Sequence, residues 1–241
     1  MKTAVKNIIG FLIIIPAGIV CSVTAFESLK DFFLNSPLNI VFFSGVFVYV
    51  AIRYFVKWIG YEFVEVGEVL VHELVHGFFS LLFLGDIKSL SVSSKKGGQV
   101  SVSRSNFIVE LSPYCFPLIT IVICSVRPFF VQVAEIYVVF LAGFSLGQHL
   151  CSLLKDFHLG QSDILNNGVV FSFSVVLFFN VLSIGLVSVT LSEGFSGVPL
   201  FAVKTMHFAQ KCIYIILKFD YALYGSQCLN WCRGIISSIG F

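Results

Sequence analysis

The chain has 241 residues, of which 57% are hydrophobic and only 12% are charged. A soluble domain carries about 25% charged and about 45–50% apolar residues, and one soluble core of this size cannot bury so large an apolar excess. The net charge of +2 argues against nucleic-acid binding, and the 28 phenylalanines argue against disorder. We therefore predict an all-α polytopic membrane protein.

Six apolar segments approach or exceed the length of about 20 residues that a helix needs to cross a bilayer. They cover residues 8–26, 38–55, 63–84, 107–126, 130–154 and 168–191. The first segment follows Lys2 and Lys6 without a convincing small-residue cleavage site, which is typical of a signal anchor. Pro113 and Pro117 predict a kink in the fourth segment.

These segments divide the chain into three parts. Residues 1–62 hold the first two transmembrane helices, and residues 63–191 form a transmembrane core. In residues 192–241, apolar runs are interrupted by basic residues. We expect this tail to be either an amphipathic helix in the membrane interface or an additional helix near residues 208–219.

Two polar connections interrupt the apolar core. In residues 85–106, apolar residues and serines alternate on both sides of Gly97-Gly98, which predicts a short β-hairpin. The second connection, residues 155–167, contains two aspartates. With six spans and a cytoplasmic N-terminus, nine of the 15 Lys and Arg residues fall inside. This small bias puts both connections on the side opposite the N-terminus.

Residues 72–76 read HELVH, an HExxH motif within the third apolar segment. His72 and His76 are one helical turn apart and share a face, so both imidazoles can bind one zinc ion. Glu73 lies about 100° further round the helix, within reach of a water molecule at the metal. The pattern is typical of metallopeptidases, in which the metal acidifies the water and the glutamate takes its proton.

Ionisable groups inside a membrane span cost at least about 2.5 kcal/mol each, so we interpret this cluster as functional. Glu68 lies four residues before His72, and we expect it either to orient that ring or to be a charge near the helix end. A catalytic zinc site also needs a third protein ligand, and spacing alone does not choose it. The downstream candidates are Glu110, Glu135, His149, Asp156, His158 and Asp163.

A membrane-embedded HExxH, a polar hairpin after it and a later aspartate together resemble the site-2 protease family of intramembrane zinc metallopeptidases. The similarity is greatest to the small, divergent M50B-like bacterial branch, and it covers about residues 63–190. Tyr114 begins a Tyr-x-x-Pro element, and a Ser-Asp pair ending in Asp163 precedes the last core helix. The resemblance implies that Asp163 is the third ligand, and Asp156 and Glu135 are the alternatives.

The predicted function is therefore that of an intramembrane zinc metalloendopeptidase. Zn²⁺ would be bound by His72, His76 and Asp163, and Glu73 would activate the water. The substrate would be a transmembrane protein segment that unwinds locally and pairs with the free edge of the hairpin. The resemblance further implies a multi-pass protein of the bacterial cytoplasmic (inner) membrane, in contact with the lipid bilayer. The sequence does not identify a regulatory membrane partner.

Two other functions stay open from the sequence. A membrane zincin of the HtpX type takes a downstream glutamate as its third ligand, and Glu135 is the plausible one. A non-catalytic membrane protein, such as a transporter or an assembly factor, would have a structural or vestigial metal site. The GxSxG match at residues 143–147 lies in the middle of a span, which favours helix packing over a serine nucleophile.

Overall fold

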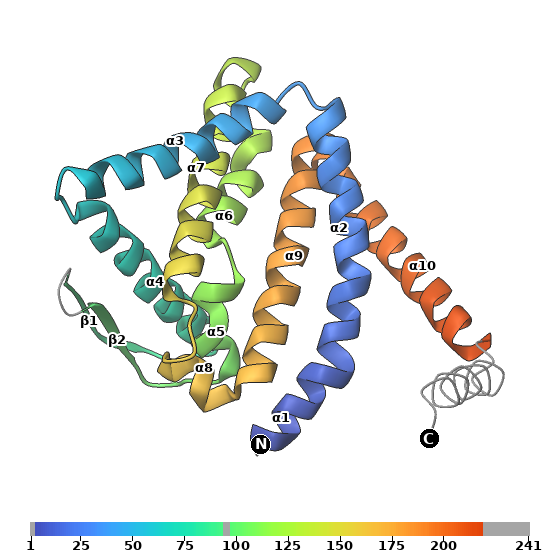
Figure 1. Cartoon of the computed structure of the whole chain (residues 1–241). Helices are drawn as coiled ribbons and strands as arrows, with labels where there is room; N and C mark the ends of the chain where they lie inside the picture. Colours follow the sequence, from blue (N-terminus) through green and yellow to red (C-terminus); the bar gives the residue numbers. More distant parts are fainter. Residues whose placement is uncertain (1–2, 94–96, 219–241) are drawn as a thin grey trace, which may run out of the picture.

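The computed structural model describes residues 3–93 and 97–218, and this part of the chain is mostly helical (Figure 1). The chain begins with a continuous helix of 33 residues, made of α1 (Thr3–Ile9), the π-helical segment η1 (Gly10–Ile14) and α2 (Ile15–Asn35). The later elements are α3 (Asn39–Trp58), α4 (Phe63–Leu82), β1 (Ile87–Ser93), β2 (Gly97–Val102), α5 (Phe107–Cys115), α6 (Leu118–Val126), η2 (Arg127–Phe129), α7 (Gln132–Asp156), α8 (Ser162–Asn167), α9 (Val169–Glu193), η3 (Gly194–Ser196) and α10 (Gly197–Lys218). The predicted combination of apolar helices with one short hairpin is confirmed.

Four helical stretches are long and apolar enough to cross a membrane, or five if the bent pair of α5 and α6 forms one span. Six were predicted. The third predicted segment forms helix α4. This helix is not among the four apolar stretches, because it contains three glutamates: Glu65, Glu68 and Glu73. Many large apolar side chains on the long helices are exposed, among them Phe11 and Leu12 at 63% each. The long apolar helices are thus compatible with an integral membrane protein.

The fourth predicted segment is broken between α5 and α6, whose axes meet at 70°. Phe116 has an extended backbone at the break, and Pro117 precedes the first residue of α6. Proline disfavours helical geometry in the residue before it and lacks an N–H group, so the expected kink occurs here. The bend places the C-terminal end of α5 beside α4.

Close packing of α3 against α7 depends on glycines. A Cβ atom on Gly45 or on Gly143 would collide with backbone atoms of the facing helix, such as the carbonyl oxygen of Phe42 in the case of Gly143. Gly147 approaches α3 in the same way, and Ser145 is buried within α7. The GxSxG match therefore lies at a helix–helix contact, as the sequence predicts.

The hairpin pairs β1 and β2 in antiparallel register, with Leu90 opposite Val100. It packs on α4, where Gly77 leaves room for the side chain of Ile87: a Cβ atom on Gly77 would lie 2.8 Å from Ile87 Cδ1. The hairpin therefore lies against the same helix that carries the HExxH motif (Figure 1).

The described part of the tail forms an additional helix, α10, which begins earlier than the predicted segment at residues 208–219. Its buried Phe201 packs with Cys21 and Ala25 of α2 and with Val189 of α9. Residues 219–241 of the predicted tail lie outside the described residues.

The N-terminal end of the chain lies beside the connection before α9. Lys6 Nζ donates a hydrogen bond to Asn167 Oδ1 at 2.6 Å, so α1 and α8 occupy the same end of the molecule (Figure 1). The predicted side assignment had separated them. The reason is visible in Figure 1, where α3 slopes away from the far end of α2 and α4 returns below it toward the N-terminal end.

Candidate metal centre

Three side chains from two distant segments converge beside the hairpin. His72 and His76 lie on one face of α4 with their ring centroids 4.9 Å apart, and Asp163 comes from α8. One potential ligand atom from each residue lies within 4.8 Å of the other two. His76 Nε2 and Asp163 Oδ2 are 3.6 Å apart, close to the separation of about 3.4 Å between two tetrahedral ligands of a zinc-sized ion. The cluster could therefore hold a metal ion.

The ring of His76 is oriented by the backbone of α5. His76 Nδ1 lies 2.7 Å from the carbonyl oxygen of Val109. Because a carbonyl oxygen only accepts, Nδ1 carries the proton and donates it, which leaves the lone pair of Nε2 toward Asp163. A histidine ligand with its second nitrogen bonded to a carbonyl is the usual arrangement in metal sites.

Asp163 lies in the first turn of α8 and receives a hydrogen bond from the hydroxyl of Tyr114 at 3.3 Å. Burial raises the pKa of the Asp163 carboxyl above its ordinary value, while His76 and the hydrogen bond from Tyr114 oppose that rise. A metal ion at this position would favour the charged carboxylate, because opposite charges stabilise each other in a poorly solvated site.

Glu73 is only 8% exposed and points toward β2. Its carboxylate accepts a hydrogen bond from the backbone N–H of Val100. A Cβ atom on Gly98 would lie 2.5 Å from Glu73 Cγ, so the glycine is what allows this close approach. Because the Val100 N–H points to Glu73 and not to β1, the unpaired edge of β2 faces the metal cluster.

These groups line a partly open cavity of about 490 Å³. His72, Glu73 and His76 line one side of it, and residues 98–100 of β2 line another. Asp163 comes from the connection between α7 and α9. The arrangement combines a candidate metal cluster, a buried carboxylate and an edge of β2 that no other described strand pairs with in one cavity.

Glu68 does not bond to His72. Its carboxylate is fully buried and accepts hydrogen bonds from Tyr49 (2.7 Å) and Arg53 (2.6 Å) of α3. Lys155 of α7 lies 3.7 Å from it. Of the two predicted roles for Glu68, orientation of His72 is therefore wrong. Glu68 is the charge near the helix end, and its contacts connect α4 with α3 and α7.

The other candidate ligands lie apart from the cluster in the described residues. Asp156 lines the same cavity and accepts a hydrogen bond from Ser152 at 3.0 Å, but it is not one of the three converging groups. Glu135 is paired with Arg127 at 2.5 Å beside a separate pocket. His149 lies behind the site, as described below.

Glu110 and the exposed His158 have other partners. Glu110 accepts hydrogen bonds from Asn167 at 2.5 Å and from Ser105 at 3.0 Å. His158 contacts the backbone of Gly160. Sequence reasoning missed the contact of the Val109 carbonyl with His76 and that of Asn167 with Glu110, because a backbone carbonyl and a single amide form no recognisable motif. The sequence indicated Tyr114 only as part of a Tyr-x-x-Pro element, without its hydrogen bond to Asp163.

The fold and the cluster define a largely helical protein with membrane-compatible helices and a candidate metal centre. Comparisons with protein-family models, with curated proteins and with solved structures find no match to this chain. The functional assignment therefore depends on the residues of the site themselves.

Proposed function

We propose that the protein is a zinc-dependent endopeptidase that cleaves membrane-embedded protein segments. The observation that carries the proposal is the approach of Asp163 to His72 and His76, with ligand atoms within 4.8 Å of one another. Glu73 borders the same cavity, which is where an HExxH peptidase needs its general base. As the resemblance to site-2 proteases implies, we place the protein in the cytoplasmic membrane of a bacterium.

His72, His76 and Asp163 would hold the zinc ion, and three is the number of protein ligands typical of a catalytic zinc site. A bound zinc ion supplies Lewis acidity, which acidifies a water molecule and polarises a carbonyl group. Glu73 then takes the proton from the attacking water and delivers it to the leaving amine. Its hydrogen bond from Val100 holds the carboxylate at the cavity wall for both transfers.

The free edge of β2 offers a docking place for the substrate backbone. An extended segment can add to a strand edge through main-chain hydrogen bonds. A transmembrane helix would have to unwind first, since its peptide groups are hydrogen-bonded internally. Gly98 and Val102, two residues on either side of Val100, line the same cavity and present their backbone groups in the same direction.

The first experiment measures zinc per chain by elemental analysis after purification in detergent without chelators. We expect about one zinc in the wild type, and its loss in His72→Ala and in Asp163→Ala, because two protein ligands hold a catalytic zinc ion poorly. Glu135→Gln, which keeps an oxygen for Arg127, should retain the metal. Loss of zinc in Glu135→Gln with retention in Asp163→Ala would favour the HtpX-type alternative, and no zinc in the wild type would refute the proposal.

The second experiment measures cleavage of single-span reporter proteins in proteoliposomes. Glu73→Gln should keep its zinc and cleave about 10²- to 10⁴-fold more slowly, which is the usual contribution of a general base. Glu65→Gln is the matched control, because Glu65 lies on the same helix and is paired only loosely with Lys57, at 3.9 Å. Undiminished cleavage by Glu73→Gln would remove Glu73 from the reaction.

A further inference from the structure

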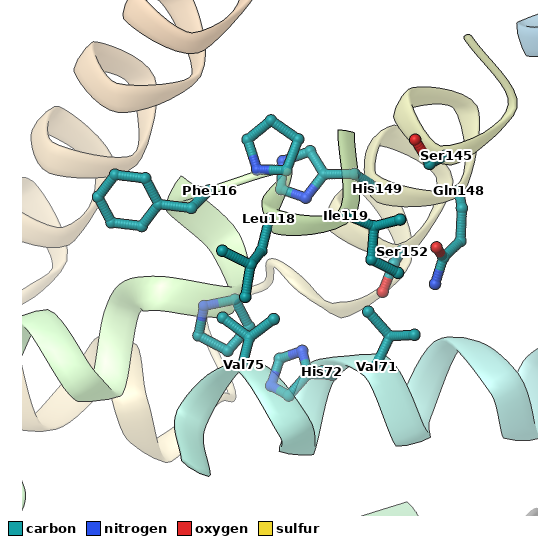
Figure 2. A pocket seen from close by; sticks show the side chains of 12 residues that line it. Val71, His72, Val75, Phe116, Leu118, Ile119, Ser145, Gln148, His149 and Ser152 are labelled. Carbon is teal, nitrogen blue, oxygen red and sulfur yellow. The ribbon is translucent and has the colours of Figure 1, made fainter. Parts of the chain in front are cut away.

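His72 also lines a second, much smaller cavity (Figure 2). Its volume is about 30 Å³, and it lies between α4, the break between α5 and α6, and α7. Figure 2 shows His72 on α4, and Ser145, Gln148, His149 and Ser152 along α7 across the cavity from it. A cavity needs about 10–15 Å³ and two to four polar partners to hold a water molecule, and this one meets both conditions.

The hydrogen bonds around Asn180 determine which nitrogen of His149 carries its proton. Asn180 Nδ2 donates to the carbonyl oxygens of Tyr114 (2.7 Å) and Val176 (2.8 Å), which fixes the orientation of the amide. Asn180 Oδ1 then faces His149 Nε2 at 2.9 Å and can only accept. His149 Nε2 therefore carries the proton, and Nδ1 of this neutral ring is an acceptor.

The serines that line the small cavity differ in what they can offer. The hydroxyl of Ser152 donates to Asp156 Oδ2 at 3.0 Å, so its oxygen can still accept a hydrogen bond. Ser145 is already bonded to the carbonyl oxygen of Ala142 and to Thr120. Two side chains of the lining can thus accept a hydrogen bond, His149 through Nδ1 and Ser152 through Oγ.

His72 needs a partner for the ring nitrogen that does not face the metal. Metal-binding histidines almost always donate that N–H to a carboxylate, a carbonyl or a water molecule, as His76 does to Val109. No described residue is hydrogen-bonded to the ring of His72, yet this ring lines both the small cavity and the large one. The small cavity therefore offers a place for this partner.

We propose that a buried water molecule in the small cavity accepts the N–H of His72 and donates to His149 Nδ1 and Ser152 Oγ. The water then has three partners, and the amide of Gln148, on the same wall, can supply a fourth. His149 becomes a positioning residue for a metal ligand, acting through this water and held in turn by Asn180. This inference rests on the metal site of the proposed function.

The test compares zinc affinities, measured by competition with a chromogenic chelator, together with the visible spectrum of the cobalt-substituted protein. His149→Phe keeps an aromatic ring of similar size but removes the acceptor, and we expect zinc to bind about 10- to 100-fold more weakly. His149→Gln, whose amide oxygen can accept, should recover most of the affinity and the wild-type cobalt spectrum. His158→Phe, which changes the exposed histidine, is the control and should bind as the wild type does.

Ser152→Val provides an independent variant that fills the cavity while leaving His149 in place, and the same weakening is expected. Thermal unfolding of the metal-free proteins shows whether each variant folds. If His149→Phe does not fold, Ser152→Val still tests the proposal. If the wild type binds no metal, the proposed function itself fails. If the wild type binds zinc and the folded His149→Phe or Ser152→Val protein binds it equally well with an unchanged cobalt spectrum, the water-mediated role of His149 is refuted.

Discussion

Each side chain of the cluster is held by a different kind of neighbour. A backbone carbonyl orients His76, and the hydroxyl of Tyr114 bonds to Asp163. The proposed water would orient His72. Loss of such an outer contact typically weakens metal binding about 10- to 100-fold, since these contacts set the direction of each lone pair before the metal arrives.

At the residue scale, Gly98 allows the proposed catalytic role of Glu73 to be tested separately from metal binding. In Gly98→Ala the new Cβ atom would lie 2.5 Å from Glu73 Cγ, so the carboxylate has to move away from β2. Because Glu73 is not a ligand, we expect zinc content to stay at the wild-type level while cleavage falls at least about tenfold, as displacement of a general base predicts. Both quantities can be measured on the same preparation.

The matched control is Gly67→Ala, five residues before the motif on α4. A Cβ atom on Gly67 meets no atom within 4 Å, and alanine is the better helix former, so this variant should cleave normally and be slightly more stable. Equal cleavage by the two alanine variants would show that Glu73 does not depend on its contact with β2.

At the scale of the element, α8 is a six-residue helix that has to place Asp163 accurately. It ends at Gly168, whose φ of +92° is readily adopted only by glycine, so the chain can turn directly into α9. Asn167 anchors the helix: it donates to Glu110 at 2.5 Å and accepts from Lys6 at 2.6 Å. The N-terminal helix therefore takes part in positioning Asp163.

The second feature at this scale is the close contact between α3 and α7. It can be tested by a substitution that adds a single methyl group at the contact. Gly143→Ala would place a Cβ atom against the backbone of Phe42, which no rotation of a side chain can relieve. We expect a loss of about 1–3 kcal/mol in the free energy of unfolding, the usual cost of overpacking. The measurement is thermal or denaturant unfolding in detergent.

Gly18→Ala on α2 is the comparison for this variant. Its nearest neighbours are atoms of Phe178 at 3.9 Å, an ordinary contact distance, so the substitution should be neutral or stabilising by up to about 1 kcal/mol. Similar unfolding midpoints for the two variants would argue against close α3–α7 packing.

At the scale of the whole molecule, the contact between Lys6 and Asn167 constrains the path of the chain. Two segments at the same end of a membrane protein are separated by an even number of crossings. The helix of residues 3–35 leaves this end, α3 and α4 together return to it, α5 and α6 leave again, and α7 returns (Figure 1). The hairpin and the candidate metal centre then face the same side as the N-terminus.

Cysteine labelling with a membrane-impermeant maleimide tests this arrangement. Thr3→Cys and Ser91→Cys, both at exposed positions, should react from the same side of sealed membrane vesicles. Phe129 is 87% exposed in η2, between α6 and α7, and Phe129→Cys should react from the other side. Labelling of Thr3→Cys and Ser91→Cys from opposite sides would contradict the structure and favour six independent spans.

Prediction from the sequence succeeded where neighbouring residues decide the outcome. The helix carrying His72 and His76 and the hairpin that follows it were both expected from local patterns. Asp163 entered only through a resemblance to a family, because its place depends on how α5, α7 and α8 pack. The partners of Glu68 were not predicted, since Arg53 and Lys155 lie on two other helices whose orientation the spacing does not reveal.

The sequence by itself determined the apolar helices, the hairpin and the shared face of the HExxH motif. Hydropathy and periodicity are local properties, and they persist whatever the rest of the chain does. Only the tertiary structure decided which carboxylate approaches the two histidines, which edge of β2 faces Glu73 and which ends of the helices lie together. These features depend on contacts between segments distant in the chain, and helix rotation and packing set them.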